Sequence, residues 1–188
     1  MKIIWPLILI SYASLFVFGI SDNIRGPLFP EILKDFNVSD SMGSLMFALS
    51  SISGFFASHL TRHLLRRYDR KSILQIGCLG LTFALLGMAL APSFQIFLAL
   101  SVIFGMCSGI LGLIPNVLVP LGASAEKKQQ LLSGLHAMYG IASLLAPMLV
   151  AAIGFFTKNW RITFALTAIT PLTVSYTHLR AHETSLHL

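Results

Sequence analysis

A cluster of positive charges between two long apolar stretches constrains this chain more than any other feature. Residues 41–60 and 73–91 contain no Lys, Arg, Asp or Glu, and the loop 61–72 between them holds five of the chain's thirteen Lys and Arg residues. A charge at the centre of a bilayer costs about 2.5 kcal/mol or more, whereas Lys and Arg accumulate in cytoplasmic loops beside helix ends. The pattern predicts two membrane spans joined by a cytoplasmic loop.

The bulk composition favours the same class of protein. Hydrophobic residues make up 55% of the 188-residue chain, charged residues make up 11%, and the mean hydropathy is +0.80. A soluble domain of this size cannot bury so much apolar surface, and a spanning helix needs about 20 apolar residues. The net charge of +6 comes from loop residues that do not alternate with aromatic ones, so we expect a lipid bilayer and no nucleic acid as partner.

The apolar runs predict an all-α, polytopic membrane protein with six helices. We expect these helices at approximately residues 3–30, 41–60, 73–91, 96–121, 131–156 and 162–173. The first run is longer than the apolar core of a signal peptide and no small-residue cleavage site follows it, so it predicts a helix that is retained. Gly26, Pro27 and Pro30 mark its end.

Loop charges give the orientation. Alternating spans place eight positive charges on one side, from Lys2, the loop 61–72, Lys127 and Lys128. The other side receives four, from Arg25, Lys34, Lys158 and Arg161. The excess predicts a cytoplasmic amino terminus, and we expect the plasma membrane of a bacterium as the location.

The chain turns abruptly polar after Thr173. Residues 174–184 resemble a translated sequencing adapter, and the alternative is a genuine His-containing cytoplasmic tail. On the first interpretation residues 1–173 are the domain, residues 174–188 are a non-native tail, and helix six is incomplete within a longer gene. No metal site is then expected at the suggestively spaced residues His178, His182, Glu183 and His187.

Several of these features resemble a known family. The sequence GISDNIRGPLFP at 19–30, the basic loop after the second span and the six-helix spacing resemble the amino-terminal half of a major facilitator superfamily transporter. The resemblance implies one half of a twelve-helix fold, a missing carboxy-terminal half as partner, and transport of a small-molecule substrate by alternating access. It also implies that this half cannot transport alone.

The basic loop matches that family's gating motif, G-x-L-x-D-R-x-G-R-R, only in part. The chain keeps its apolar and cationic positions, Leu64, Arg67, Arg70 and Lys71. It has Arg62 and Asp69 at the two glycine positions and Arg66 at the acidic position. The resemblance therefore implies a cytoplasmic gating loop in which Asp69 either replaces the missing acid or is a solvated loop charge.

The fourth and fifth spans narrow the expected subgroup. Drug and proton antiporters carry an Arg four residues before a glycine in helix four, and Ser101 stands there relative to Gly105. Residues 105–116 and 135–140 resemble the fucose, galactose and glucose proton symporters, although Gly112 occupies a position that is acidic in some of them. We expect a proton- or ion-coupled transporter of a small polar solute, with a sugar as one candidate. The alternatives are an efflux antiporter of the same superfamily and a complete six-helix transporter or channel that dimerises.

Ionisable or strongly polar residues inside spans are the candidate pathway residues, because they are costly there. They are Asp22, Arg25, Asn116, His136 and Tyr139. Asp22 leads, since a carboxylate facing a cavity can exchange a proton as substrate binds. A structural pair with Arg25 and an interfacial charge are its alternatives.

The remaining candidates have two readings each. His136 either lines the pathway or is a buried neutral histidine, and Tyr139 and Asn116 either contact the solute or tie helices together. The spans contain no HExxH, GxSxG or paired His and carboxylate set, so we expect neither an enzyme nor a cofactor.

Overall fold

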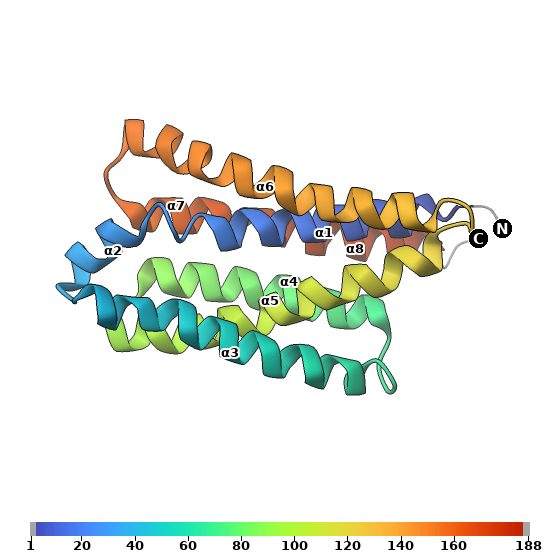
Figure 1. The fold of residues 1–188 in the computed structure, drawn as a ribbon, viewed down its shortest axis with the longest axis horizontal. Helices are drawn as coiled ribbons and strands as arrows, with labels where there is room; N and C mark the ends of the chain where they lie inside the picture. Colours follow the sequence, from blue (N-terminus) through green and yellow to red (C-terminus); the bar gives the residue numbers. More distant parts are fainter. Residues whose placement is uncertain (1–2, 186–188) are drawn as a thin grey trace.

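The computed structural model describes residues 3–185, which form a bundle of α-helices along one common axis (Figure 1). The helices are α1 (Trp5–Asn23), α2 (Phe29–Phe36), α3 (Asp40–Leu64), α4 (Arg70–Leu90), α5 (Phe94–Gly122), α6 (Lys128–Phe156), α7 (Trp160–Thr167) and α8 (Ile169–Ser185). Helices α1, α3, α4, α5 and α6 each pass along the bundle, and α7 and α8 together form one further pass. The predicted all-α fold is confirmed.

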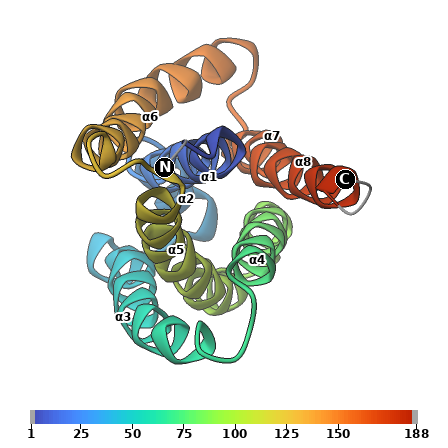
Figure 2. The same cartoon turned by 90° about the vertical axis from the view of Figure 1, so that its right-hand side faces the viewer.

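The connections between helices alternate between the two ends of the bundle. The start of α1, the α3–α4 turn, the α5–α6 turn and the end of α8 lie at one end, here called the inner end. Helix α2 and the α6–α7 loop lie at the other, the outer end (Figures 1 and 2). Within residues 3–185, five helices are long and apolar enough to cross a membrane: α1, α3, α4, α5 and α6.

The first span differs from the expected continuous helix over 3–30. Helix α1 ends at Asn23, and a turn separates it from the short helix α2. Pro27 and Pro30 lack a backbone N–H, and Pro30 lies in the first turn of α2, where that N–H needs no helical partner. Asn37, with a φ of 51°, ends α2 in a left-handed conformation.

The sixth pass is broken at Ala168, three residues before Pro171. Pro171 has no backbone N–H to donate to the Thr167 carbonyl. The Thr170 hydroxyl donates to that carbonyl instead, at 2.8 Å. Helix α8 then continues through residues 174–185, beyond the expected end at 173.

Helical geometry is the same in a genuine tail and in a translated adapter, so the origin of residues 174–188 stays a prediction. His187 lies outside the described residues. The side chains of His178, His182 and Glu183 lie outside the described part as well.

Helices α3 and α5 approach each other so closely that glycine is required between them. A Cβ atom built on Gly105 would lie 2.1 Å from the Ser50 carbonyl oxygen, and one on Gly109 would lie 2.3 Å from the Gly54 carbonyl oxygen. Serine hydroxyls cross this seam: Ser53 donates to the Val102 carbonyl at 3.0 Å and Ser58 to the Gly109 carbonyl at 3.2 Å. Close packing and interhelical hydrogen bonds therefore hold these helices together, as expected in lipid.

We predict that Gly105→Ala lowers the stability of the bundle by about 1–3 kcal/mol, because the added methyl group must push the α3 backbone away. Gly154→Ala is the matched control, since a Cβ atom there meets nothing within 4 Å and alanine favours helix. Thermal unfolding in detergent should show a lower midpoint for the first variant alone. Equal midpoints would contradict the tight seam.

Candidate functional site

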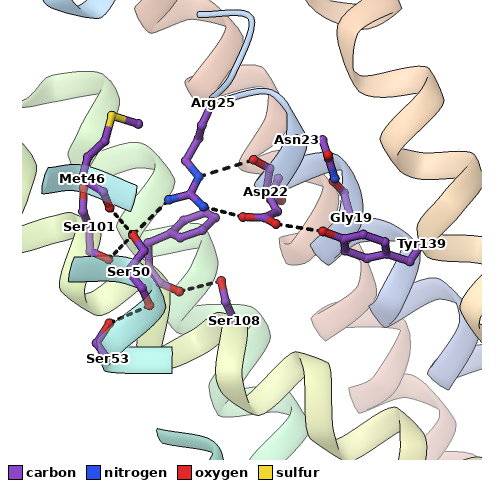
Figure 3. Close-up of polar contacts among 12 residues, drawn as sticks. Gly19, Asp22, Asn23, Arg25, Met46, Ser50, Ser53, Ser101, Ser108 and Tyr139 are labelled. Atoms are coloured by element: carbon purple, nitrogen blue, oxygen red, sulfur yellow. Dashed lines mark hydrogen bonds and ion pairs between the residues drawn. The ribbon is translucent and has the colours of Figure 1, made fainter. Parts of the chain in front are cut away.

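A buried ion pair lies where α1 ends. Arg25 follows the last turn of α1, is 5% exposed, and pairs through Nη2 with Oδ1 of Asp22 (Figure 3). Its Nη1 donates to the Ser50 hydroxyl oxygen of α3 at 2.9 Å, and its Nε approaches the Asp22 carbonyl at 3.4 Å. Three acceptors from two helices therefore surround one guanidinium group.

Two aromatic rings lie against this guanidinium. Its central carbon lies 4.1 Å from the ring centroid of Phe104 on α5 and 5.3 Å from that of Phe47 on α3. A cation over an aromatic face is stabilised by the electrons of the ring, and more so where water is excluded. The charge of Arg25 is thus held by a carboxylate, a hydroxyl and two rings, which offsets its loss of hydration.

Ser50 connects the ion pair to the α3–α5 seam. Its hydroxyl lies 2.7 Å from the Met46 carbonyl and 2.9 Å from the Ser101 carbonyl, so it has acceptors on its own helix and on α5 while it accepts from Arg25. Sequence reasoning missed Ser50, because a serine inside a span is cheap and common. A signal existed in the spacing of Ser50, Ser53 and Ser58 beside Gly54 along one span.

Tyr139 joins the ion pair to α6. Its hydroxyl donates to Oδ2 of Asp22 at 2.9 Å, across 117 residues of sequence. Gly19 permits the approach, because a Cβ atom there would lie 2.7 Å from Cβ of Ala142 and 3.2 Å from the ring of Tyr139. Both oxygens of the Asp22 carboxylate therefore have a partner, one on Arg25 and one on α6.

A polar cavity opens beside the ion pair. Its volume is about 400 Å³, within the range of small-molecule sites. Helix α1 and the turn after it contribute two charged residues and a phenylalanine, while α3 and α5 contribute mostly serines and glycines. The lining residues are Phe18, Asp22 and Arg25; Ser50, Ser51, Gly54 and Ser58 of α3; and Phe104, Gly105, Ser108, Gly109 and Gly112 of α5. Asp22 and Arg25 are the charged members of this lining, so the cavity can offer one cation, one carboxylate and several hydroxyls to a solute.

Two other predicted pathway residues do not join this cluster. Asn116 is half-buried, and its side-chain amide donates to the Gly112 carbonyl of its own helix at 2.7 Å. His136 is exposed on α6, which differs from the buried histidine that was one of its two readings. The structure thus brings together Asp22, Arg25 and Tyr139 but neither of these two.

The basic loop carries exposed charges at the inner end. Arg62, Arg66, Arg67 and Arg70 are exposed and Lys71 is half-buried. Asp69 is the N-cap of α4, where its carboxylate accepts from the Lys71 amide at 3.1 Å. No ion pair joins Asp69 to these cations within the described part of the chain, so a capping residue is what the structure shows.

A second polar cluster, which sequence reasoning did not find, ties the outer end together. Arg161 donates to Oδ2 of Asp35 at 2.9 Å through Nη2, and to the Ala89 and Ala91 carbonyls at 3.0 and 2.8 Å through Nη1. The indole of Trp160 donates to the same Asp35 oxygen at 3.2 Å. One guanidinium thus joins α2, the end of α4 and the start of α7, and a wider hollow of about 1100 Å³ lies beside it.

Long apolar helices that enclose a buried ion pair and a polar cavity are those of an integral membrane protein. The sequence model of the Major Facilitator Superfamily matches residues 12–185, and the chain belongs to that family. The family comprises transporters, so the expectation that the chain is not an enzyme is confirmed.

Two curated proteins are similar to most of the chain. Two Saccharomyces cerevisiae proteins are similar over 80% of the chain: Bypass of stop codon protein 6 at 27% identity and Probable metabolite transport protein YDR387C at 26%. The chain spans 30% and 27% of their respective lengths.

A solved structure shares the fold. The proton:xylose symporter XylE, bound to 6-bromo-6-deoxy-D-glucose, superposes with a TM-score of 0.79 over 94% of the chain and 44% of its own, at 17% identity. The predicted fold, that of one half of a major facilitator protein, is thereby confirmed.

We predict that Arg161→Gln destabilises the bundle by about 1–3 kcal/mol, because it leaves Asp35 and the carbonyls at the end of α4 without their charged donor. Lys158→Gln is the control, since Lys158 is exposed in the same loop. Thermal unfolding in detergent should separate the two variants. Matching midpoints would show that the cluster contributes nothing to stability.

Proposed function

We propose that the protein is a secondary active transporter of a small polar solute, coupled to protons at Asp22 and working by alternating access. The observation that carries the proposal is the Asp22–Arg25 ion pair on the wall of a polar cavity. A carboxylate held between a buried cation and a tyrosine hydroxyl can take up and release a proton as its partners change. In this family's fold such a site lies near the midplane, where both sides gain access in turn.

Tyr139 gives this site a connection to helix movement. It contacts Asp22 from α6, whose buried residues are only Leu135, Ala142 and Ala146 within its described length. Helix α6 packs closely on α1, where Ala142 approaches Gly19, and its other faces are largely exposed, so the α1–α6 interface is where a change at Asp22 can act. Protonation of Asp22 would weaken both its ion pair and its bond from Tyr139, and so would bias the position of α6.

The complete transporter in this proposal has a second six-helix half. The chain spans 44% of the length of XylE, and helices α3 and α6 expose apolar side chains that include Ile52, Phe56, Leu144 and Met148. Lipid or a second half would cover these faces. Alternating access requires two bodies that rock about the site, which one half cannot supply.

Orientation and location are part of the same proposal. The excess of positive charge in the loop 61–72 supports a cytoplasmic inner end, and hence a cytoplasmic amino terminus. The two curated relatives are yeast proteins, so they give the proposed bacterial plasma membrane no support. A sugar stays a candidate solute, since the superposed structure is a xylose symporter, and no observation favours efflux.

We predict that Asp22→Asn, made in a full-length protein containing this half, abolishes the rise of solute uptake at acidic external pH, because the amide cannot exchange a proton. Asp40→Asn is the matched control, since Asp40 is exposed at the start of α3. Uptake should be measured across a pH series at equal amounts of protein in the membrane. A wild-type pH profile in Asp22→Asn would remove Asp22 from coupling.

A further inference from the structure

We propose that the solute of this cavity is a small organic anion, a carboxylate, which binds the Arg25 guanidinium in place of the Asp22 carboxylate when Asp22 is protonated. The inference rests on the proposed function and names its substrate class. It follows from the charges that the cavity wall contains, taken together with the burial of Arg25.

The surroundings of Arg25 contain a single carboxylate. Helices α3 and α5 contribute serines, glycines, Phe47 and Phe104, and none of these can carry a compensating negative charge at neutral pH. Helix α6 contributes the phenol of Tyr139, which donates to Asp22. Among the described residues, Asp22 is therefore the one group that balances the charge of Arg25.

Protonation of Asp22 leaves that charge without a partner. The Arg25 side chain lines the cavity but is only 6% exposed, so water compensates poorly for the lost carboxylate, and a buried charge without its partner is strongly unfavourable. A neutral solute such as a sugar would leave the imbalance in place. A carboxylate would restore the ion pair, and each of the two ligands, proton and anion, would then favour the binding of the other.

The charge balance holds through the whole cycle. In the empty cavity a deprotonated Asp22 pairs with Arg25, and the net charge of the two side chains is zero. In the loaded cavity an Asp22 oxygen has bound a proton from the solution and the solute carboxylate pairs with Arg25. The net charge of the two side chains and the solute carboxylate is again zero. Both forms of the site are therefore neutral, whereas a proton with a neutral solute would leave one uncompensated positive charge at Arg25.

The donors needed for a carboxylate are present. Each terminal nitrogen of Arg25 has two hydrogens, and the structure uses one from Nη1 for Ser50 and one from Nη2 for Asp22. A carboxylate can accept two parallel hydrogen bonds from one guanidinium, so the remaining hydrogens on Nη1 and Nη2 suit a planar acceptor. The cavity volume of about 400 Å³ suits an acid of a few carbon atoms.

The test measures ligand binding and proton uptake on a purified full-length protein that contains this half, in lipid nanodiscs. The probes are acetate, lactate, pyruvate and succinate, each set against its uncharged amide, together with xylose. We expect at least one carboxylate to bind about tenfold or more tightly than its amide, with uptake of up to one proton for each anion bound, measured with a pH dye in weak buffer.

Variants assign the effect to the two residues. Asp22→Asn should bind the same anion without proton uptake and with no dependence on pH. Arg25→Gln should lose the preference for carboxylate over amide, and Arg25→Lys should keep the preference at lower affinity, which separates loss of charge from misfolding. Lys158→Gln, an exposed cation at the outer end, should match the wild-type protein.

Two results would contradict the proposal that the solute is an anion. The second of them would also contradict proton coupling at Asp22. If xylose or an amide binds through Asp22 and Arg25 while no carboxylate binds more tightly than its amide, the anion is wrong and transport of a polar solute stands. If folded wild-type protein binds none of the probes, or binds an anion with no proton uptake, coupling at Asp22 falls as well.

Discussion

The buried positive charge of Arg25 is the constraint on which the centre of this molecule depends. A guanidinium that is 5% exposed inside an apolar bundle must find a carboxylate, acceptors and ring faces, and it finds them on three elements: Asp22 at the end of α1, Ser50 on α3 and Phe104 on α5. Tyr139 then attaches α6 to the same carboxylate. One charge therefore links four of the six passes, and the cavity beside it takes its polarity from that charge.

Three further sets of contacts hold the rest of the bundle together. Glycine contacts and serine hydrogen bonds fix α3 to α5, and Arg161 joins α2, α4 and α7 at the outer end. Helix α6 buries few residues, and two tyrosine hydrogen bonds tie it to its neighbours, from Tyr139 to Asp22 and from Tyr12 to the Leu131 carbonyl. Tyr139 contacts the Asp22 carboxylate within the α1–α6 interface, so the proposed proton binding would act on how these two helices pack.

The sequence could predict the parts of this arrangement that follow from the cost of polarity in lipid. That cost identified the apolar passes, and it singled out Asp22, Arg25 and Tyr139 as residues that need a reason to be there. It could not reveal Ser50, because a serine in a span is inexpensive, nor the Asp35–Arg161 pair, whose members are 126 residues apart. The exposure of His136 depends on how α6 is rotated against its neighbours, which its own sequence does not determine. The N-cap role of Asp69 was readable, since an acidic residue directly before an apolar helix is a common start signal.

The most direct measurement of the central claim is a double-mutant cycle of thermal stability on Asp22→Asn, Arg25→Gln and the two combined. If the buried charge of Arg25 governs the site, Asp22→Asn alone should cost about 3–5 kcal/mol, because it leaves that charge unpaired. Adding Arg25→Gln should then restore much of the loss, since the cavity wall becomes neutral again. A double variant less stable than Asp22→Asn, with losses that simply add, would contradict this account of the ion pair.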